Sequence, residues 1–190
     1  MRRIDYIAVH CSATRPSQNL GVSWLRRLHV EQNRWSDVGY HYVITRDGKI
    51  QTGRPEERMG AHVKGFNAHS IGICLIGGLD DAGDISEGFD ATFTMEQERA
   101  LRRLWRLLTS KYPDAEWKGH RDFSPDVNHD GEITPNEWLK NCPCFNVSDL
   151  LPYLSLPERP SHSLQTGSGP ASTHLGPPAK SGESLESCDD

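Results

Sequence analysis

The sequence has no long hydrophobic run. Its 190 residues contain no apolar stretch near the ~20 residues that a helix needs to cross a bilayer. The first residues, Met1-Arg2-Arg3, lead directly into a strand-like pattern without the apolar core of a signal peptide. We therefore expect a protein that is made and folded in the cytoplasm and does not insert into a membrane. If it acts on the outside of a cell, another factor must release it.

Cysteine is scarce, and neither sign of charge is in large excess. The five Cys residues are an odd number without the spacing of a disulfide framework, so we expect free thiols or a metal ligand. Through Ser155 the chain has 19 Lys and Arg residues against 21 Asp and Glu residues, a net charge of −2. This balance indicates no nucleic-acid-binding surface. We expect a monomer without a nucleic-acid partner.

Residues 156–190 lack the side chains of a hydrophobic core. They are rich in Pro, Gly, Ser and Thr and nearly free of aromatic residues. Such a segment cannot bury enough apolar surface to offset the entropy lost on ordering. We therefore predict one folded domain over residues 1–155, long enough to bury a core, followed by a disordered tail over residues 156–190.

The pattern of apolar residues predicts both strands and helices. Short β-branched segments predict strands at residues 4–10, 40–45, 49–52, 70–76 and 116–120. Helical spacing predicts helices over residues 22–32 and 94–112, the second opened by a capping box of Thr94 and Gln97. Shorter helical pieces are expected at residues 136–141 and 148–154. Strands with helices between and around them predict an α/β fold, a central mixed β-sheet flanked by helices.

Two of the predicted strands end on histidine, at His10 and His120. Residues at strand ends are held rigidly yet face the loops, where reactive sites are common. With Cys142 or Cys144 they would supply the three protein ligands of a catalytic zinc site. Spacing alone leaves both cysteines open. It also leaves open two structural histidines beside two ordinary buried thiols.

An oxygen-rich segment, residues 126–137, lies between His120 and these cysteines. It matches the positions of an EF-hand calcium loop, with a glycine at the sharp turn. Oxygen ligands suit calcium, and the predicted ligands are Asp126, Asn128, Asp130, Glu132, Thr134 and Glu137. Ser124-Pro125 disfavours an entering helix, so we expect a helix only after the loop. The alternative is an acidic turn that needs no ion.

Five blocks of the sequence, in order, resemble type 2 N-acetylmuramoyl-L-alanine amidases. This group includes short phage endolysins and is similar to peptidoglycan recognition proteins. The matching blocks are residues 10–14 (HCSAT), 37–42 (DVGYHY), 67–78 (NAHSIGICLIGG), 119–121 (GHR) and 140–143 (KNCP). The resemblance implies a zinc amidase fold. It also implies cleavage of the amide between the lactyl group of N-acetylmuramic acid and L-alanine.

The same resemblance implies roles for individual residues. The zinc ligands would be His10, His120 and Cys142, the last because Cys-Pro-x-Phe begins there. Tyr40 and Lys140 match the two catalytic positions, and His62 would lie near the substrate groove. Zinc lowers the pKa of bound water toward ~7, and the Lys140 ammonium and the Tyr40 hydroxyl could stabilise the oxyanion that forms during amide hydrolysis.

The resemblance favours a phage or prophage endolysin that acts on the cell wall after release. One alternative is a cytoplasmic amidase that recycles anhydromuropeptides, but that group has Asp as its third zinc ligand. Another is a non-catalytic peptidoglycan-binding module, whose members lack the Cys ligand. Cys142 therefore argues against both alternatives. A structural zinc protein is a third possibility, which would require a fourth protein ligand.

Overall fold

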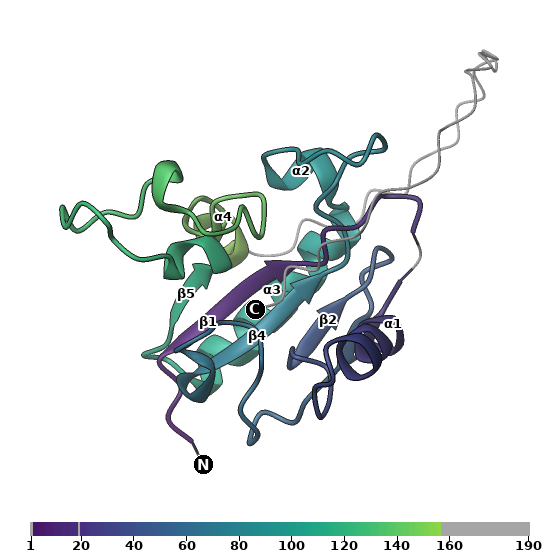
Figure 1. Cartoon of the computed structure of the whole chain (residues 1–190), viewed down its shortest axis with the longest axis horizontal. Helices are drawn as coiled ribbons and strands as arrows, with labels where there is room; N and C mark the ends of the chain where they lie inside the picture. Colours follow the sequence, from purple (N-terminus) through teal and green to yellow (C-terminus); the bar gives the residue numbers. More distant parts are fainter. Residues whose placement is uncertain (1, 19, 157–190) are drawn as a thin grey trace.

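The computed structural model describes residues 2–18 and 20–156, so all of the predicted tail except Leu156 lies outside the described residues. Five strands form one sheet in the order β3-β2-β4-β1-β5 (Figure 1). Their bounds are β1 Tyr6–Cys11, β2 Tyr42–Ile44, β3 Ile50–Thr52, β4 Ser70–Leu75 and β5 Glu116–Gly119. Neighbouring strands are parallel except in the β2–β3 hairpin, which is antiparallel. The predicted mixed sheet is therefore confirmed.

Three helical segments follow the predicted pattern, whereas α2 was not predicted. Their bounds are α1 Val22–Arg27, continued by a π-helical turn at Leu28–Gln32, α2 Phe89–Thr92, α3 Met95–Lys111 and α4 Val147–Ser155. The capping box is present, because the Gln97 amide donates to Thr94 Oγ1 and the Thr94 amide donates to Gln97 Oε1. None of the helices in this part of the chain has the length and apolar composition that a membrane crossing requires.

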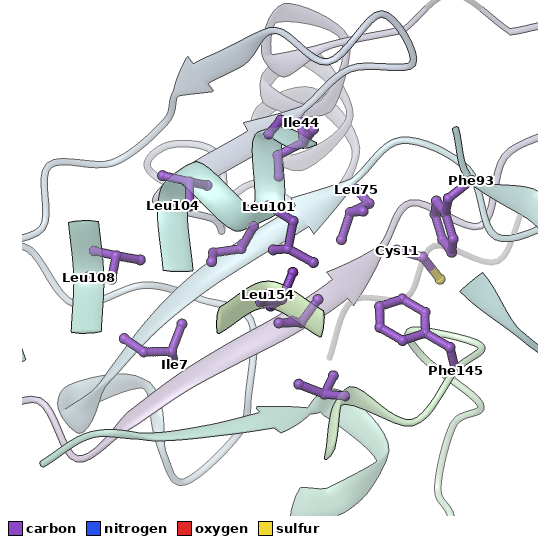
Figure 2. Packing of buried hydrophobic residues seen from close by; sticks show 14 of the residues in the cluster. Ile7, Cys11, Ile44, Leu75, Phe93, Leu101, Leu104, Leu108, Phe145 and Leu154 are labelled. Atoms are coloured by element: carbon purple, nitrogen blue, oxygen red, sulfur yellow. The ribbon is translucent and has the colours of Figure 1, made fainter. Parts of the chain in front are cut away.

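The hydrophobic core lies mainly between the sheet and the pair of helices α3 and α4. In Figure 2 the side chains of Leu101, Leu104 and Leu108 on α3 meet Ile7 of β1 and Leu154 of α4. Side chains of a strand alternate between the two faces of the sheet. Because Ile7, Val9 and Cys11 join this core, the intervening His10 lies on the opposite face. A smaller core on that side contains Leu25 of α1.

The register of the parallel strands brings the two histidines together. Val9 of β1 pairs with Gly119 of β5, so the next residues, His10 within β1 and His120 just after β5, lie beside each other at the same end of the two strands. His120 begins a 3₁₀ turn, His120–Phe123, instead of ending the strand as predicted. Parallel neighbours thus fix the separation of two residues that lie far apart in the sequence.

One predicted helix is absent. Residues 136–141 were expected to be helical, but only Pro135–Glu137 form a 3₁₀ turn, and Trp138 is already extended. Residues 138–142 instead bond to an earlier part of the chain. The Leu139 amide donates to Ser124 Oγ, and the Cys142 carbonyl accepts from the Arg121 amide. These contacts replace the hydrogen bonds that a helix would make. The segment between β5 and α4 therefore runs as a loop beyond the edge of the sheet (Figure 1).

Candidate metal centre

His10, His120 and Cys142 converge at this edge of the sheet. Their candidate ligand atoms all lie within 4.8 Å of one another. The Nδ1 atoms of His10 and His120 are 3.1 Å apart, and Cys142 Sγ is 3.8 Å from His10 Nδ1. Among the described residues, no other group of three or more His, Cys, Asp or Glu side chains is as close.

This arrangement fits a zinc ion. Tetrahedral zinc with bonds of about 2.0 Å to nitrogen and about 2.3 Å to sulfur separates its ligand atoms by about 3.3 Å (nitrogen to nitrogen) and about 3.6 Å (nitrogen to sulfur). The observed separations of 3.1 and 3.8 Å are close to these values. Two imidazoles and one thiolate also form a donor set that suits zinc. The group supplies three protein ligands, as catalytic zinc sites do, whereas structural sites have four.

The surroundings of the site keep His10 neutral. His10 is completely buried, and this burial lowers its pKa well below the usual value, with further lowering by His120, His62 and Lys140. Metal ligation requires the unprotonated ring, so burial favours the ligating form of His10. The Cys11 backbone amide donates to Cys142 Sγ over 3.3 Å, a contact that would stabilise a thiolate ligand at this position. The sequence offered no signal for this contact, because every non-proline residue carries such an amide.

His62 lies behind His10. Its Nδ1 is 3.1 Å from His10 Nε2, and its Nε2 is 3.4 Å from Ser70 Oγ. Like Tyr40, His62 is buried, with 2% of its surface exposed, and the substrate contact that the sequence predicted for it stays a prediction. His62 contacts the His10 ring at Nε2, whereas His120 and Cys142 lie near the other ring nitrogen, Nδ1.

Of the two predicted catalytic residues, Tyr40 contacts His10 directly, whereas Lys140 is related to it only through its charge. The Tyr40 ring packs against His10 with centroids 5.1 Å apart, and only 1% of Tyr40 is exposed. Lys140 is half-buried, and its positive charge helps to lower the pKa of His10. Tyr40 lies two residues before β2, whereas Lys140 comes from the loop that leads to Cys142.

The two candidate cysteines have different partners. Cys142 Sγ lies 3.8 Å from His10 Nδ1, whereas Cys144 Sγ lies 3.8 Å from Cys11 Sγ, and both cysteines belong to the main core. Cys11, Cys142 and Cys144 are all buried. Of the two thiols that spacing left open, Cys142 is the one in the His10–His120 group.

The predicted calcium loop has a different geometry from the zinc group. No three of its acidic side chains come within 4.8 Å of one another in the described structure. Several of its predicted ligands accept hydrogen bonds from the loop's own backbone. Asp126 Oδ2 accepts from the Gly131 amide, Glu137 Oε1 from the Val127 amide, and Glu137 Oε2 from the Thr134 amide. Calcium binding at residues 126–137 therefore stays a prediction from the sequence pattern.

Comparison with known proteins agrees with this geometry. Residues 1–143 match the family model for N-acetylmuramoyl-L-alanine amidase. The chain is 46% identical over 143 residues to the endolysin of Escherichia phage T7, an alignment that covers 75% of this chain and 82% of the relative. It is 45% identical over 143 residues to the endolysin of Enterobacteria phage T3, with the same coverage.

Solved structures share the fold. The endolysin N-acetylmuramoyl-L-alanine amidase LysCS from Clostridium intestinale superposes with a TM-score of 0.61 at 25% identity, over 82% of this chain and 86% of that one. Drosophila PGRP-LB superposes with a TM-score of 0.56 at 22% identity, over 75% and 76% of the two chains, a likeness of fold alone. With its fold, its His/His/Cys group and the family match over residues 1–143, this chain belongs to the N-acetylmuramoyl-L-alanine amidase family.

Proposed function

We propose that this protein is a zinc-dependent N-acetylmuramoyl-L-alanine amidase that hydrolyses the lactyl–L-alanine amide of peptidoglycan. The observation that carries the proposal is the convergence of His10, His120 and Cys142 at one edge of the sheet, in a chain that matches the amidase family. Three ligands suit a catalytic zinc, while a structural zinc would require a fourth. When bound, zinc supplies Lewis-acid activation of water and of the amide carbonyl.

The chain's own residues prepare this site. Burial keeps the His10 ring neutral and ready to ligate. His62, 3.1 Å from the distal nitrogen of His10, fixes the orientation of that ring. Such contacts to a ligating histidine hold its tautomer and direction, and their loss commonly weakens metal binding. We therefore assign His62 to ligand orientation rather than to substrate binding.

Lys140 and Tyr40 are the proposed catalytic residues. Hydrolysis adds water across the amide, leaving a lactyl carboxylate and the free amine of L-alanine. Negative charge builds on the carbonyl oxygen as water adds, and the Lys140 ammonium, which acts electrostatically on His10, is the nearby cation that can stabilise it. The Tyr40 hydroxyl is the proposed second donor, on a ring that packs directly against His10.

The biological role that we propose is that of a phage or prophage endolysin. Relatives at 45–46% identity are named endolysins. The protein would be made in the host cytoplasm, would reach the cell wall after release, and would take peptidoglycan or soluble muropeptides as substrate. The domain would comprise residues 1–155, and residues 156–190 would not be needed for its folding. A non-catalytic binding module fits less well, because the ligand group is complete.

Calcium remains part of the proposal as a structural ion. The loop over residues 126–137 places oxygen-bearing side chains at EF-hand positions, and Asp126 Oδ1 is buried without a hydrogen-bond partner among the described residues. A calcium ion there would offset two of the three negative charges of Asp126, Asp130 and Glu137. It would thereby hold the loop that leads to Lys140 and Cys142.

The decisive experiment is analysis of muropeptide cleavage by mass spectrometry. The protein is incubated with purified muropeptides as prepared, after treatment with a zinc chelator, and after zinc is restored. We expect products with a free lactyl carboxylate and a free L-alanine amine, lost with chelator and regained with zinc. Cleavage that persists after the metal is removed would overturn the zinc mechanism. Absence of these products from zinc-loaded protein would overturn the amidase assignment.

A further inference from the structure

Arg121 is a buried cation beside the metal centre. Its residue surface is only 2% exposed, although arginine is usually found in water. Nη1 donates to Asn141 Oδ1 over 2.8 Å and to Glu87 Oε1 over 2.9 Å, and Nη2 donates to Asn146 Oδ1 over 2.6 Å. The guanidinium also stacks on the Trp138 ring, 3.9 Å from its centroid. One side chain therefore holds four others.

Three of the partners of Arg121 belong to the segment that carries Lys140 and Cys142. In the sequence, Trp138 and Asn141 stand on either side of Lys140, and Asn141 directly precedes Cys142. In addition, the Arg121 backbone amide donates to the Cys142 carbonyl over 2.8 Å. Asn146, the residue before α4, marks the far end of the same segment. Arg121 directly follows His120, one candidate zinc ligand. Its side chain thus connects that ligand to the loop that carries Cys142, another candidate ligand.

We infer that Arg121 is a positioning residue that sets the location of Lys140 and Cys142 relative to His120. The segment over residues 138–146 has no regular secondary structure before Val147 that could hold it in place. A planar guanidinium has several donors in fixed directions, so it can bind two amides and stack on an aromatic ring at once. Only the expected change in kcat rests on the proposed function. The effects on the loop and on metal affinity do not depend on it.

The burial of Arg121 also argues for a specific geometric role. Taking a cation out of water is costly unless it is well paired. The one carboxylate on Arg121 belongs to Glu87, whose side chain is 51% exposed, and the other polar partners are neutral amides. Apart from Glu87, the side chains that contact the guanidinium all belong to the loop over residues 138–146. A lysine would keep the charge but could not make the same set of directed contacts.

The test compares Arg121→Lys with Arg102→Lys. Arg102 is a matched control, because it is also buried and bonded, to Glu98 and to the Leu156 carbonyl, but on α3 away from the metal centre. Three measurements are made on each protein: hydrogen exchange of residues 138–146 without metal, zinc affinity by chelator competition, and the separate kcat and KM for muropeptide. The visible spectrum of the cobalt-substituted protein reports the ligand geometry directly.

We expect Arg121→Lys to speed exchange in residues 138–146, to weaken zinc binding by about 10- to 100-fold, and to lower kcat more than KM changes. Arg102→Lys should lower the melting temperature yet leave the cobalt spectrum, zinc affinity and kcat near those of the wild type. Wild-type exchange, spectrum and affinity in folded Arg121→Lys would overturn the inference. Equal metal effects in both variants would do so as well, because they would indicate general destabilisation.

If Arg121→Lys fails to fold, Asn141→Ala provides the second test. It removes one partner of the guanidinium and keeps the cation in place. We expect smaller changes in the same three measurements, and unchanged exchange, spectrum and zinc affinity would overturn the inference. If neither variant nor wild type cleaves muropeptide, the proposed function fails, while exchange and metal affinity still decide the role of Arg121.

Discussion

His62 Nδ1 lies 3.1 Å from His10 Nε2, so the ring of one metal-ligand candidate is held from behind by a second buried histidine. The Nδ1 atom of His10 faces His120 and Cys142 at the same time. His10 therefore has one nitrogen for a metal and one for a supporting contact. This division of roles is typical of ligating histidines in metalloenzymes.

Replacement of His62 should weaken the zinc site. His62→Ala removes the group that orients His10, and we expect zinc affinity to fall by about 10- to 100-fold. His62→Asn, whose amide can again meet His10 Nε2, should recover part of the loss. Chelator competition measures both variants. Wild-type zinc affinity in a folded His62→Ala protein would contradict the role assigned to His62.

The two cysteines at the end of the loop should behave differently. Cys142→Ser should lose zinc and nearly all amidase activity, because it removes the sulfur that lies 3.8 Å from His10 Nδ1. Cys144→Ser should retain most of both, because its sulfur contacts Cys11 instead. Metal content by elemental analysis distinguishes the two variants. A zinc-free Cys144→Ser protein would show that the ligand assignment is wrong.

Loss of the proposed oxyanion donors should affect catalysis more than metal binding. Lys140→Ala and Tyr40→Phe should each keep bound zinc while kcat falls by about 10²- to 10³-fold, the usual effect of removing one such donor. Steady-state kinetics on muropeptide, with zinc content measured on the same samples, provide the check. Wild-type turnover in both variants would remove these residues from the mechanism.

Calcium should stabilise the protein through the loop over residues 126–137. Without an ion, Asp126, Asp130 and Glu137 lie in one loop as like charges, so binding should raise the melting temperature by mass action. Isothermal titration of calcium into zinc-loaded protein tests binding, and Glu137→Ala should abolish the response. No heat of binding at millimolar calcium would exclude a calcium site. Binding without a change in melting temperature or rate would leave the ion uncoupled from the zinc site.

Acid should destabilise the fold through His41. Burial lowers the pKa of His41 from 6.5 to about 4, an effect that its hydrogen bond to the Arg58 carbonyl partly offsets. The Gly72 amide donates to His41 Nδ1 and so requires that nitrogen to be unprotonated. The unfolded chain therefore binds the proton more tightly. The stability from neutral His41 is fully present above pH 6.5 and is lost as pH falls toward 4.

The expected size of this effect is about 2 kcal/mol between pH 7 and pH 5, from about 1.4 kcal/mol for each unit of pKa difference. Urea unfolding of metal-free wild type and His41→Gln at the two pH values measures it. Whatever the absolute stability of the variant, its stability should change less with pH than that of the wild type. An equal loss in both proteins would assign the acid effect to other groups, such as His10 and His62, whose pKa values burial also lowers.

Local patterns in the sequence were enough to predict most of the secondary structure. The capping box at Thr94 and the apolar face of α3 predicted that helix, because helix signals depend on residues three or four positions apart. The alternation and β-branching of short segments predicted the strands for the same local reason. The two histidines were also found from the sequence, since His10 is the penultimate residue of β1 and His120 directly follows β5.

Contacts between segments far apart in the sequence determined the loop before α4 and the arrangement of the metal centre. The helix predicted over residues 136–141 does not form. The Leu139 amide donates to Ser124 Oγ instead, and the Arg121 amide holds the carbonyl of Cys142, just after the segment. Spacing could not separate Cys142 from Cys144, since two residues along a turn reverse the direction of a side chain, and only the folded loop directs one sulfur to His10 and the other to Cys11. The contacts of His62 and Arg121 likewise join residues far apart in the chain, where no local pattern records which side chains will meet.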